Sequence, residues 1–352
     1  MIRIGIDAAN FARDRRGMGR VARTIVEATI ADPAFVPTLL VTNRRDAAPV
    51  ERLFEGRATV QPARVAARRS RYDVVWFPWN GMRFSAAAPS VLTINDAFAF
   101  TYPAKGIVAK MREQAPIRRG ARHASIIVTP SRYSQREIAR ALPVAAERIT
   151  VIPYAADPFF SPSQSSRQHS HHYVLMIGAR ETRKHASLVI EACRTAFGVD
   201  DLLIVVGDLA PADRRSLSRA HLRHTVLRNV SDEGLRELYR GARVVAVPST
   251  AEGFGLVAVE AMACGTATIA SNTSALPEAT QGAALLLDPC DSTAWSDAIG
   301  RVLHDDAFAM KLAAQGAARF AFSDRSAFAR AYLRLFVDLV DDRAQPFDKT
   351  LR

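Results

Sequence analysis

One segment in the second half of the chain, residues 248–279, carries the residues best suited to chemistry. It follows an apolar run, turns through Glu252-Gly253-Phe254-Gly255 and enters a predicted helix near Leu256. Glycine lets a backbone adopt positive φ and approach a ligand closely. The unpaired amides at the start of a helix attract anions. We therefore expect this loop to hold an anionic ligand.

Two carboxylates belong to this segment. Glu252 lies in the turn and Glu260 lies just over one turn inside the helix, and we expect both to face the ligand. A carboxylate accepts hydrogen bonds from sugar or ribose hydroxyls. The alternative is that an acidic residue near a helix start serves the helix itself, by capping it or by opposing its dipole.

The segment resembles the E-x7-E signature of family 4 glycosyltransferases, with E-G-F-G-L, then E-A-M-A-C-G and finally S-x-L-P-E. The resemblance implies that Glu252 contacts the transferred sugar and that Glu260 binds the ribose hydroxyls. It also implies that the backbone of residues 253–256 contacts the sugar and the diphosphate. Val257 and Ala267-Thr268 stand where the family has Pro and Pro-Val, and these departures concern packing more than the ligand.

A basic loop, GARETRK at residues 178–184, resembles the family's G-x-x-x-x-R-K loop after the first strand of the C-terminal domain. The resemblance implies that Lys184 and an arginine neutralise the diphosphate and stabilise the charge that develops as the sugar leaves. Arg183 and Arg180 are both candidates for that arginine. A solvated basic loop is the alternative without a function.

Two further loops resemble donor-binding loops of the family. The turn V-S-D-E begins at Val230, and the family uses its backbone near the nucleotide base. RGMGR at residues 16–20 places Gly17 and Gly19 between a predicted strand and a helix, like the family's G-x-G-R loop over the donor phosphates. A nicotinamide-binding fingerprint would require G-x-G-x-x-G, and Ala22 stands at its last position.

The first half departs from the family at two landmarks. Asn95-Asp96 stands where many members have His-Asp, and Tyr154-Ala155 replaces Asn-Gly in the I-P-N-G-V-D landmark. Asn95 can donate and accept hydrogen bonds but cannot carry a proton. Either it orients the donor sugar as the histidine does, or the enzyme is slow. Asp96 is either an acceptor contact or a loop cap, and Trp79 either stacks on a sugar ring or is a structural aromatic.

Strands and helices must position these loops. Both halves of the chain alternate short apolar runs with amphipathic segments, a pattern typical of parallel sheets covered by helices. The predicted strands of the first half are residues 2–6, 38–42, 74–77, 90–94, 125–128 and 150–152. Its predicted helices are residues 19–31, 107–124 and 134–142. The predicted strands of the second half are residues 173–177, 202–206, 225–227, 244–247, 268–270 and 284–287.

The resemblance and the repeated pattern together predict an α/β protein of GT-B type, with two Rossmann-like domains facing across a cleft. Ligands of open parallel sheets bind beyond the carboxyl ends of the strands. We expect an acceptor-binding domain at residues 1–160, a Ser-rich linker at 161–172 and a nucleotide-sugar-binding domain at 173–325. A helix predicted over residues 326–340 opens the last segment, 326–352, which we expect to pack back on the first domain before a polar tail.

Length and composition agree with a globular protein of two domains, because the chain has 352 residues and is 49% hydrophobic. It contains no run of the ~18–20 apolar residues that a membrane-spanning helix needs. The start of the chain has no signal-peptide pattern, so we expect a cytosolic protein. The three cysteines have no metal-ligand spacing and indicate incidental thiols.

The net charge of +12 lies entirely in the first half. Residues 1–160 hold 25 Lys+Arg and 13 Asp+Glu, and the remainder holds 47 − 25 = 22 basic and 35 − 13 = 22 acidic residues. Such asymmetry can dock a protein on the anionic inner face of the cell membrane, steer an anionic substrate or bind nucleic acid. A solvated basic surface is the neutral alternative. We expect no nucleic-acid partner, because no aromatic-interleaved basic stripe accompanies the charge.

The resemblance implies a retaining glycosyltransferase that uses no metal or other cofactor, and the chain contains no D-x-D sequence. We expect it to move a hexose, with mannose from GDP-mannose as first choice and UDP-linked sugars as an alternative. The implied acceptor is a glycan or a polyprenyl-linked glycan. A second hypothesis is a catalytically weak scaffold subunit that binds a nucleotide sugar, and Asn95 is the residue that favours it.

Overall fold

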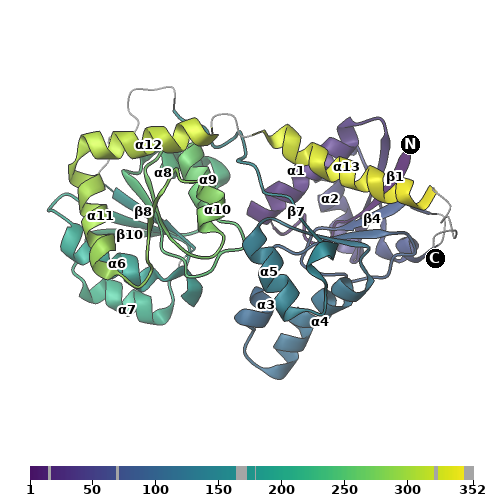
Figure 1. The fold of residues 1–352 in the computed structure, drawn as a ribbon, viewed down its shortest axis with the longest axis horizontal. Helices are drawn as coiled ribbons and strands as arrows, with labels where there is room; N and C mark the ends of the chain where they lie inside the picture. The colour runs from purple at the N-terminus through teal and green to yellow at the C-terminus, as the bar shows by residue number, and fades with distance from the viewer. Residues whose placement is uncertain (15–16, 69–70, 164–172, 179, 321–323, 345–352) are drawn as a thin grey trace, which may run out of the picture. The chain divides into compact units, whose positions relative to one another are not determined.

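The computed structural model describes residues 1–14, 17–68, 71–163, 173–178, 180–320 and 324–344. The chain divides into two compact units, shown in Figure 1. The first unit comprises Met1–Tyr154 and Arg325–Arg352, and the second comprises Ala155–Asp324. Each unit is a parallel sheet covered by helices and is described by itself.

The sheet of the first unit has seven strands. They are β1 (Ile2–Asp7), β2 (Phe35–Val41), β3 (Thr59–Pro62), β4 (Val74–Phe77), β5 (Ser90–Thr93), β6 (Ile126–Thr129) and β7 (Ile149–Val151). Their order is β3-β2-β1-β4-β5-β6-β7, and every neighbouring pair is parallel. All four residues of β4 and of β5 are buried, as expected for strands covered on both faces.

Helices cover both faces of this sheet (Figure 1). They are α1 (Gly17–Ala31), α2 (Ala47–Leu53), α3 (Phe98–Thr101), α4 (Ile107–His123), α5 (Arg132–Ala141) and α13 (Arg325–Ala344). The last of these contains the predicted tail helix, and it packs against α1 and β4. Its Tyr332 and Phe336 pack on Trp76, with ring centroids 5.6 and 6.0 Å away.

The second unit repeats this architecture with six strands. They are β8 (Tyr173–Ile177), β9 (Leu202–Val206), β10 (His224–Leu227), β11 (Val244–Val247), β12 (Thr268–Ser271) and β13 (Leu285–Leu287), in the order β10-β9-β8-β11-β12-β13. The helices are α6 (Ala186–Ala196), α7 (Pro211–Arg219), α8 (Asp232–Gly241), α9 (Leu256–Ala263), α10 (Leu276–Thr280), α11 (Ser292–His304) and α12 (Asp306–Phe320). The strand order reverses between β8 and β11, which is where open α/β sheets bind ligands.

The division between the units differs from the predicted boundary after residue 160. The first unit ends at Tyr154, and the segment that follows it packs on the second unit. The ring of Phe160 meets that of Tyr239 edge to face, and Arg240 Nε donates to the carbonyl of Ser161 at 2.8 Å. Most of the predicted linker, residues 164–172, lies outside the described residues.

Candidate active site

The site is built on two loops that leave neighbouring strands of the second unit. The strands β8 and β11 are parallel neighbours, with Val174 opposite Val244. The loop after β8 carries Lys184, and the loop after β11 carries Glu252. Because parallel strands end at the same edge of a sheet, the basic loop and the glycine loop meet at the point where the strand order reverses.

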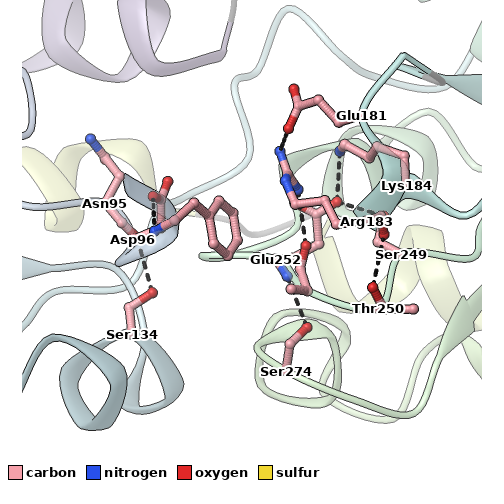
Figure 2. Close-up of polar contacts among 12 residues, drawn as sticks. Asn95, Asp96, Ser134, Glu181, Arg183, Lys184, Ser249, Thr250, Glu252 and Ser274 are labelled. Atoms are coloured by element: carbon pink, nitrogen blue, oxygen red, sulfur yellow. Dashed lines mark hydrogen bonds and ion pairs between the residues drawn. The ribbon is translucent and has the colours of Figure 1, made fainter. Parts of the chain in front are cut away.

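Glu252 lies at the centre of a buried cluster of charges, which Figure 2 shows. Lys184 Nζ lies 2.6 Å from its Oε1, and Arg183 Nη1 lies 3.3 Å from its Oε2. Ser249 Oγ also donates to Oε1, at 2.7 Å. The three charged side chains are 11–13% exposed, so they interact away from bulk water. The structure thus brings together the three residues that the sequence predicted to be catalytic.

The cations keep Glu252 ionised although it is buried. Burial alone would raise the pKa of this carboxyl. The charges of Lys184 and Arg183, with hydrogen bonds from Lys184 and Ser249, outweigh burial and hold the pKa below its ordinary value. The buried part of the site therefore holds two fixed cations and one ionised carboxylate.

Backbone hydrogen bonds join the loops of the cluster. Arg183 Nη1 donates to the carbonyl of Ala251 at 2.9 Å, and the amide of Thr250 donates to the carbonyl of Arg183 at 2.8 Å. The amide of Glu252 donates to Ser274 Oγ at 3.0 Å (Figure 2). Residues after β8, β11 and β12 thus hold one another. Sequence reasoning missed Ser249 and Ser274, although Ser274 opens the S-x-L-P-E sequence.

A second carboxylate holds Arg183 from outside the cluster. Glu181 Oε2 lies 2.5 Å from Arg183 Nη2, and the Glu181 side chain is 60% exposed. The arginine is therefore shared between a buried and an exposed carboxylate. Arg180, the other predicted candidate, is exposed and lies in the turn before this pair. The geometry favours Arg183 as the partner of Lys184.

The glycine loop enters α9 at the predicted residue, Leu256. Gly255 precedes it with φ of 112°, and a Cβ at this position would lie 2.8 Å from Leu276 Cδ2. Only glycine satisfies both the positive φ and the close approach. Gly253 and Phe254 complete the turn, and the Phe254 ring is buried. The turn is therefore fixed by backbone geometry before any ligand binds.

Glu260 lies inside α9 and is also buried. Tyr239 Oη, from α8, donates to its Oε2 at 3.0 Å. The sequence predicted a ribose contact for this carboxylate but gave no sign of the tyrosine, which lies on a different helix. Val230 is half-buried just before Ser231, whose Oγ accepts from the amide of Gly234 at the start of α8.

The predicted phosphate loop of the first unit opens α1. Gly17 is the first residue of this helix, and Arg16 lies outside the described residues. A Cβ at Gly19 would lie 2.0 Å from the carbonyl oxygen of Asp14. The close approach of these two backbones explains the second glycine of the sequence without a ligand.

Asn95 is held at both ends of its side chain. Its Nδ2 and its backbone amide donate to Asn80 Oδ1, each at 2.7 Å. Tyr154 Oη donates to its Oδ1 through a short hydrogen bond. Ser134 Oγ donates to its carbonyl at 2.9 Å (Figure 2). Asn95 and Tyr154, the two departures from the family landmarks, are therefore hydrogen-bonded partners.

Two residues of the first unit, Trp79 and Asp96, were predicted to contact the acceptor. Trp79 is buried in the first unit, where its Nε1 donates to the carbonyl of Asp7 at 2.8 Å and its ring meets Phe11 edge to face. A ring enclosed in this way cannot stack on a sugar, so Trp79 is a structural aromatic. Asp96 is half-buried, and its Oδ1 accepts from the amide of Phe98 at the start of α3.

Asp7 ends β1 and was not predicted as a functional residue. Its carboxyl is fully buried, and Oδ1 accepts from the amide of Ala9 at 3.0 Å. Oδ2 has no hydrogen-bond partner among the described residues. Burial raises the pKa of Asp7 to about 6, against the weaker opposing effects of the Ala9 hydrogen bond and the charge of Arg83.

The part of the chain that the structure describes holds neither a metal-binding cluster nor a membrane-spanning helix. They contain no group of three or more His, Cys, Asp or Glu side chains arranged to hold a metal ion. None of their helices is long and apolar enough to span a bilayer.

Comparison with known proteins gives matches along most of the chain. Residues 17–158 match the family model described as Glycosyltransferase Family 4, and residues 160–319 match Glycosyl transferases group 1. The chain is 29% identical over 288 residues to O-antigen chain mannosyltransferase B of Escherichia coli, which covers 76% of this chain and 75% of that protein. It is 40% identical over 109 residues to D-inositol 3-phosphate glycosyltransferase of Corynebacterium jeikeium, a match to 30% of this chain and 26% of that protein.

The fold is similar to that of HepE from Anabaena, solved in complex with UDP and glucose, with a TM-score of 0.77. The alignment covers 96% of this chain and all of HepE at 17% sequence identity, so it supports the fold alone. The fold and the family models agree with the prediction from the sequence. The chain belongs to the glycosyltransferases of GT-B fold, with a family 4 domain in its first half and a group 1 domain in its second.

Proposed function

We propose that this glycosyltransferase moves a hexose, mannose from GDP-mannose as first choice, to a glycan or a polyprenyl-linked glycan. The observation that carries the proposal is the buried Glu252–Lys184–Arg183 cluster beside the glycine loop. It supplies two fixed cations for a diphosphate and a carboxylate for sugar hydroxyls. Mannose is favoured because the E. coli relative, which matches three quarters of the chain, is a mannosyltransferase.

The roles we propose follow from this geometry. Lys184 and Arg183 stabilise the nucleoside diphosphate as the bond between the sugar C1 and the phosphate oxygen breaks. The acceptor hydroxyl attacks C1 on the same face, and its proton passes to the departing phosphate oxygen, so the anomeric configuration is retained. The cations do what a metal does in other transferases, which is why we propose a metal-independent reaction. Glu252 contacts the sugar and holds both cations in place.

The base and the sugar need a direct test. UDP-linked sugars are the alternative, since HepE was solved with UDP and glucose. We would measure the thermal shift of the protein with GDP, UDP, ADP and their common sugar conjugates, each with and without a chelator. The proposal expects GDP and GDP-mannose to stabilise the protein whether or not chelator is present. Stabilisation by UDP alone would favour a UDP-linked sugar over GDP-mannose as the donor. Loss of the stabilisation in the presence of chelator would reject metal independence.

Turnover then separates an enzyme from a nucleotide-sugar-binding scaffold, the reading that Asn95 favours. Release of nucleoside diphosphate from the identified donor would be followed with a polyprenyl-linked glycan extract as acceptor. Glu252→Gln should abolish most of the release, and Glu191→Gln, on the exposed surface of α6, should not. Donor binding without consumption by the wild-type protein would favour the scaffold.

A further inference from the structure

A chain of hydrogen-bonded side chains in the first unit ends at Asn80, in the loop after β4. Tyr154 Oη donates to Asn95 Oδ1, and Asn95 Nδ2 donates to Asn80 Oδ1 at 2.7 Å. The backbone amide of Asn95 donates to the same Asn80 oxygen, also at 2.7 Å. Two donors engage both lone pairs of this oxygen. The oxygen end of the Asn80 amide is therefore fully used within the protein.

The nitrogen end of the Asn80 amide can be assigned from a single backbone group. A backbone N–H can only donate, so the Asn80 atom that the Asn95 amide meets must be the oxygen, and the other atom must be Nδ2. Among the residues that the structure describes, none accepts a hydrogen bond from this Nδ2. Asn80 is half-buried, and its Nδ2 is not one of the enclosed polar atoms of those residues. The amide therefore presents two N–H donors at the surface of the unit.

Asn80 lies where a parallel sheet binds ligands. It follows the last residue of β4 by three positions, and the order of the first sheet reverses between β1 and β4. Its φ is 52°, in the left-handed region that asparagine enters more readily than most other residues with a side chain. Its backbone amide donates to the carbonyl of Thr93, at the end of β5, at 3.1 Å. The side chain therefore starts from the carboxyl edge of the sheet, beside the point of reversal.

The residues after Asn80 fix the loop against α4. A Cβ at Gly81 would lie 2.8 Å from the carbonyl carbon of Pro116, so the two backbones approach closely there. The amide of Met82 donates to the carbonyl of Pro116 at 3.0 Å. Because the loop is held by β5 and by α4, the donors of Asn80 keep one direction before any ligand binds. A group that is already held in its binding position loses little entropy when it binds.

We propose that Asn80 binds the acceptor glycan, with Nδ2 donating to the oxygen of a sugar hydroxyl. The inference rests on the proposed function, which gives the chain a glycan acceptor, and it names a residue that recognises this acceptor. A neutral amide suits a neutral hydroxyl, whereas a diphosphate has the cations Lys184 and Arg183 of the second unit. Asn95 and Tyr154 are positioning residues, because they fix the oxygen end of the amide and so the direction of its nitrogen end.

The test measures glycan binding by the full-length protein without donor. The probe is the glycan freed by mild acid from a polyprenyl-linked glycan extract, and its dissociation constant is measured by saturation-transfer NMR. Asn80→Gly removes the amide, and glycine adopts the positive φ without strain. Asn80→Asp keeps the oxygen that Asn95 meets and puts lone pairs in place of the two donors. The matched control is Asn43→Asp, at an exposed position of the same unit where Oδ1 accepts from the amide of Arg45 at 3.0 Å.

We expect Asn80→Gly to weaken glycan binding about tenfold, the weight of one hydrogen bond, and Asn80→Asp to weaken it several-fold. The control should bind like the wild type. Thermal stabilisation by the donor should be unchanged in every variant, because the amide serves the acceptor. Equal glycan binding by the wild type and Asn80→Gly, including no binding by either, would overturn the inference. So would full binding by Asn80→Asp, since the amide would then matter only through the oxygen that Asn95 meets.

Failure of this inference can be told apart from failure of the proposed function. A protein that binds the glycan through Asn80 but transfers no sugar contradicts the proposed transfer and supports the role of Asn80. A protein that releases nucleoside diphosphate with the extract, but binds the freed glycan equally in all variants, keeps the transfer and contradicts the role of Asn80. Loss of the stabilisation by donor in Asn80→Gly would assign the amide to the donor and would also contradict it.

Discussion

The two units share a parallel sheet whose strand order reverses at one point, and they use that point differently. In the second unit the loops after β8 and β11 bring together Glu252, Lys184 and Arg183. In the first unit Asp7 ends β1 and Trp79 lies in the loop after β4, and the two buried residues are joined by a hydrogen bond. The fold supplies the same location twice, and only the side chains decide which location carries a dense cluster of charge.

The largest effect on activity should come from removing one cation of the second unit. Lys184→Ala should lower turnover by roughly 10²–10³-fold, because one fixed charge on a departing diphosphate has the weight of an oxyanion-hole donor. The loss should appear in kcat at saturating donor. Lys311→Ala, at an exposed position of α12 in the same unit, is the matched control. A Lys184 variant with the kinetics of the control would show that the charged cluster is structural.

The buried carboxylates of the two units predict opposite responses to pH. The folded pKa of Asp7 is raised from 3.8 to about 6. A raised acid binds its proton more tightly in the folded state, so its stabilising effect is complete below pH 3.8 and disappears as pH rises through 6. From that shift we expect Asp7 to cost the first unit roughly 3 kcal/mol at neutral pH. Asp7→Asn should remove this decline, as measured by unfolding between about pH 4 and pH 7.

The contribution of Glu252 to stability should change with pH in the opposite direction to that of Asp7. Its folded pKa is lowered from 4.5, so its stabilising effect is present above pH 4.5 and is lost as pH falls through the folded value. Glu252→Gln should flatten the acid limb of the unfolding profile and leave the decline caused by Asp7. A single variant that changed both limbs would contradict the assignment of one carboxylate to each limb.

The pairing of Asn95 with Tyr154 predicts a smaller, measurable coupling within the first unit. Asn95→Ala and Tyr154→Phe each remove one end of the same hydrogen bond. We expect the free energy of unfolding of the double variant to differ from the sum of the singles by about 1 kcal/mol. Tyr72→Phe, a buried tyrosine of the same unit whose hydroxyl donates to Gln61 instead, serves as the control. If the changes in the free energy of unfolding of the two single variants simply add, Asn95 and Tyr154 are not coupled.

The smallest effect should come from the exposed carboxylate on Arg183. Glu181→Gln removes the outer partner of this arginine and leaves the bonds to Glu252 and Ala251. Because Glu181 is mostly exposed, we expect stability to change by less than about 0.5 kcal/mol. Donor affinity should rise a few-fold, since the diphosphate no longer competes with a carboxylate. Weaker donor binding would show that Glu181 orients the arginine rather than competing for it.

The sequence predicted the strands that are continuous apolar runs, and β4, β8, β9 and β11 have the predicted bounds. It missed β3, an edge strand of sequence TVQP that has no apolar run. It also missed the short helices α2 and α3, which span seven and four residues. Elements of this length are set by tertiary contacts more than by their own periodicity.

The same limit applies to the site. Glu252, Lys184 and Arg183 could be predicted because motif spacing along the chain identifies them. Ser249, Ser274 and Tyr239 act on the two buried glutamates through hydrogen bonds made across loops and helices. No periodicity marks such a residue, since its partner is chosen by the fold. Trp79 shows the reverse case, a residue with suitable chemistry whose ring is already enclosed by Phe11.

The final helix gives the chain an unusual order of assembly. The rings of Tyr332 and Phe336 complete the core around Trp76, and Tyr332 Oη shares a hydrogen bond with Thr93 Oγ1. During synthesis the first stretch of the first unit leaves the ribosome first, but it lacks this helix until the whole second unit has been made. The second unit, which is contiguous from Ala155 to Asp324, has its whole sequence available earlier. The half of the enzyme that is made first is therefore the half that matures last.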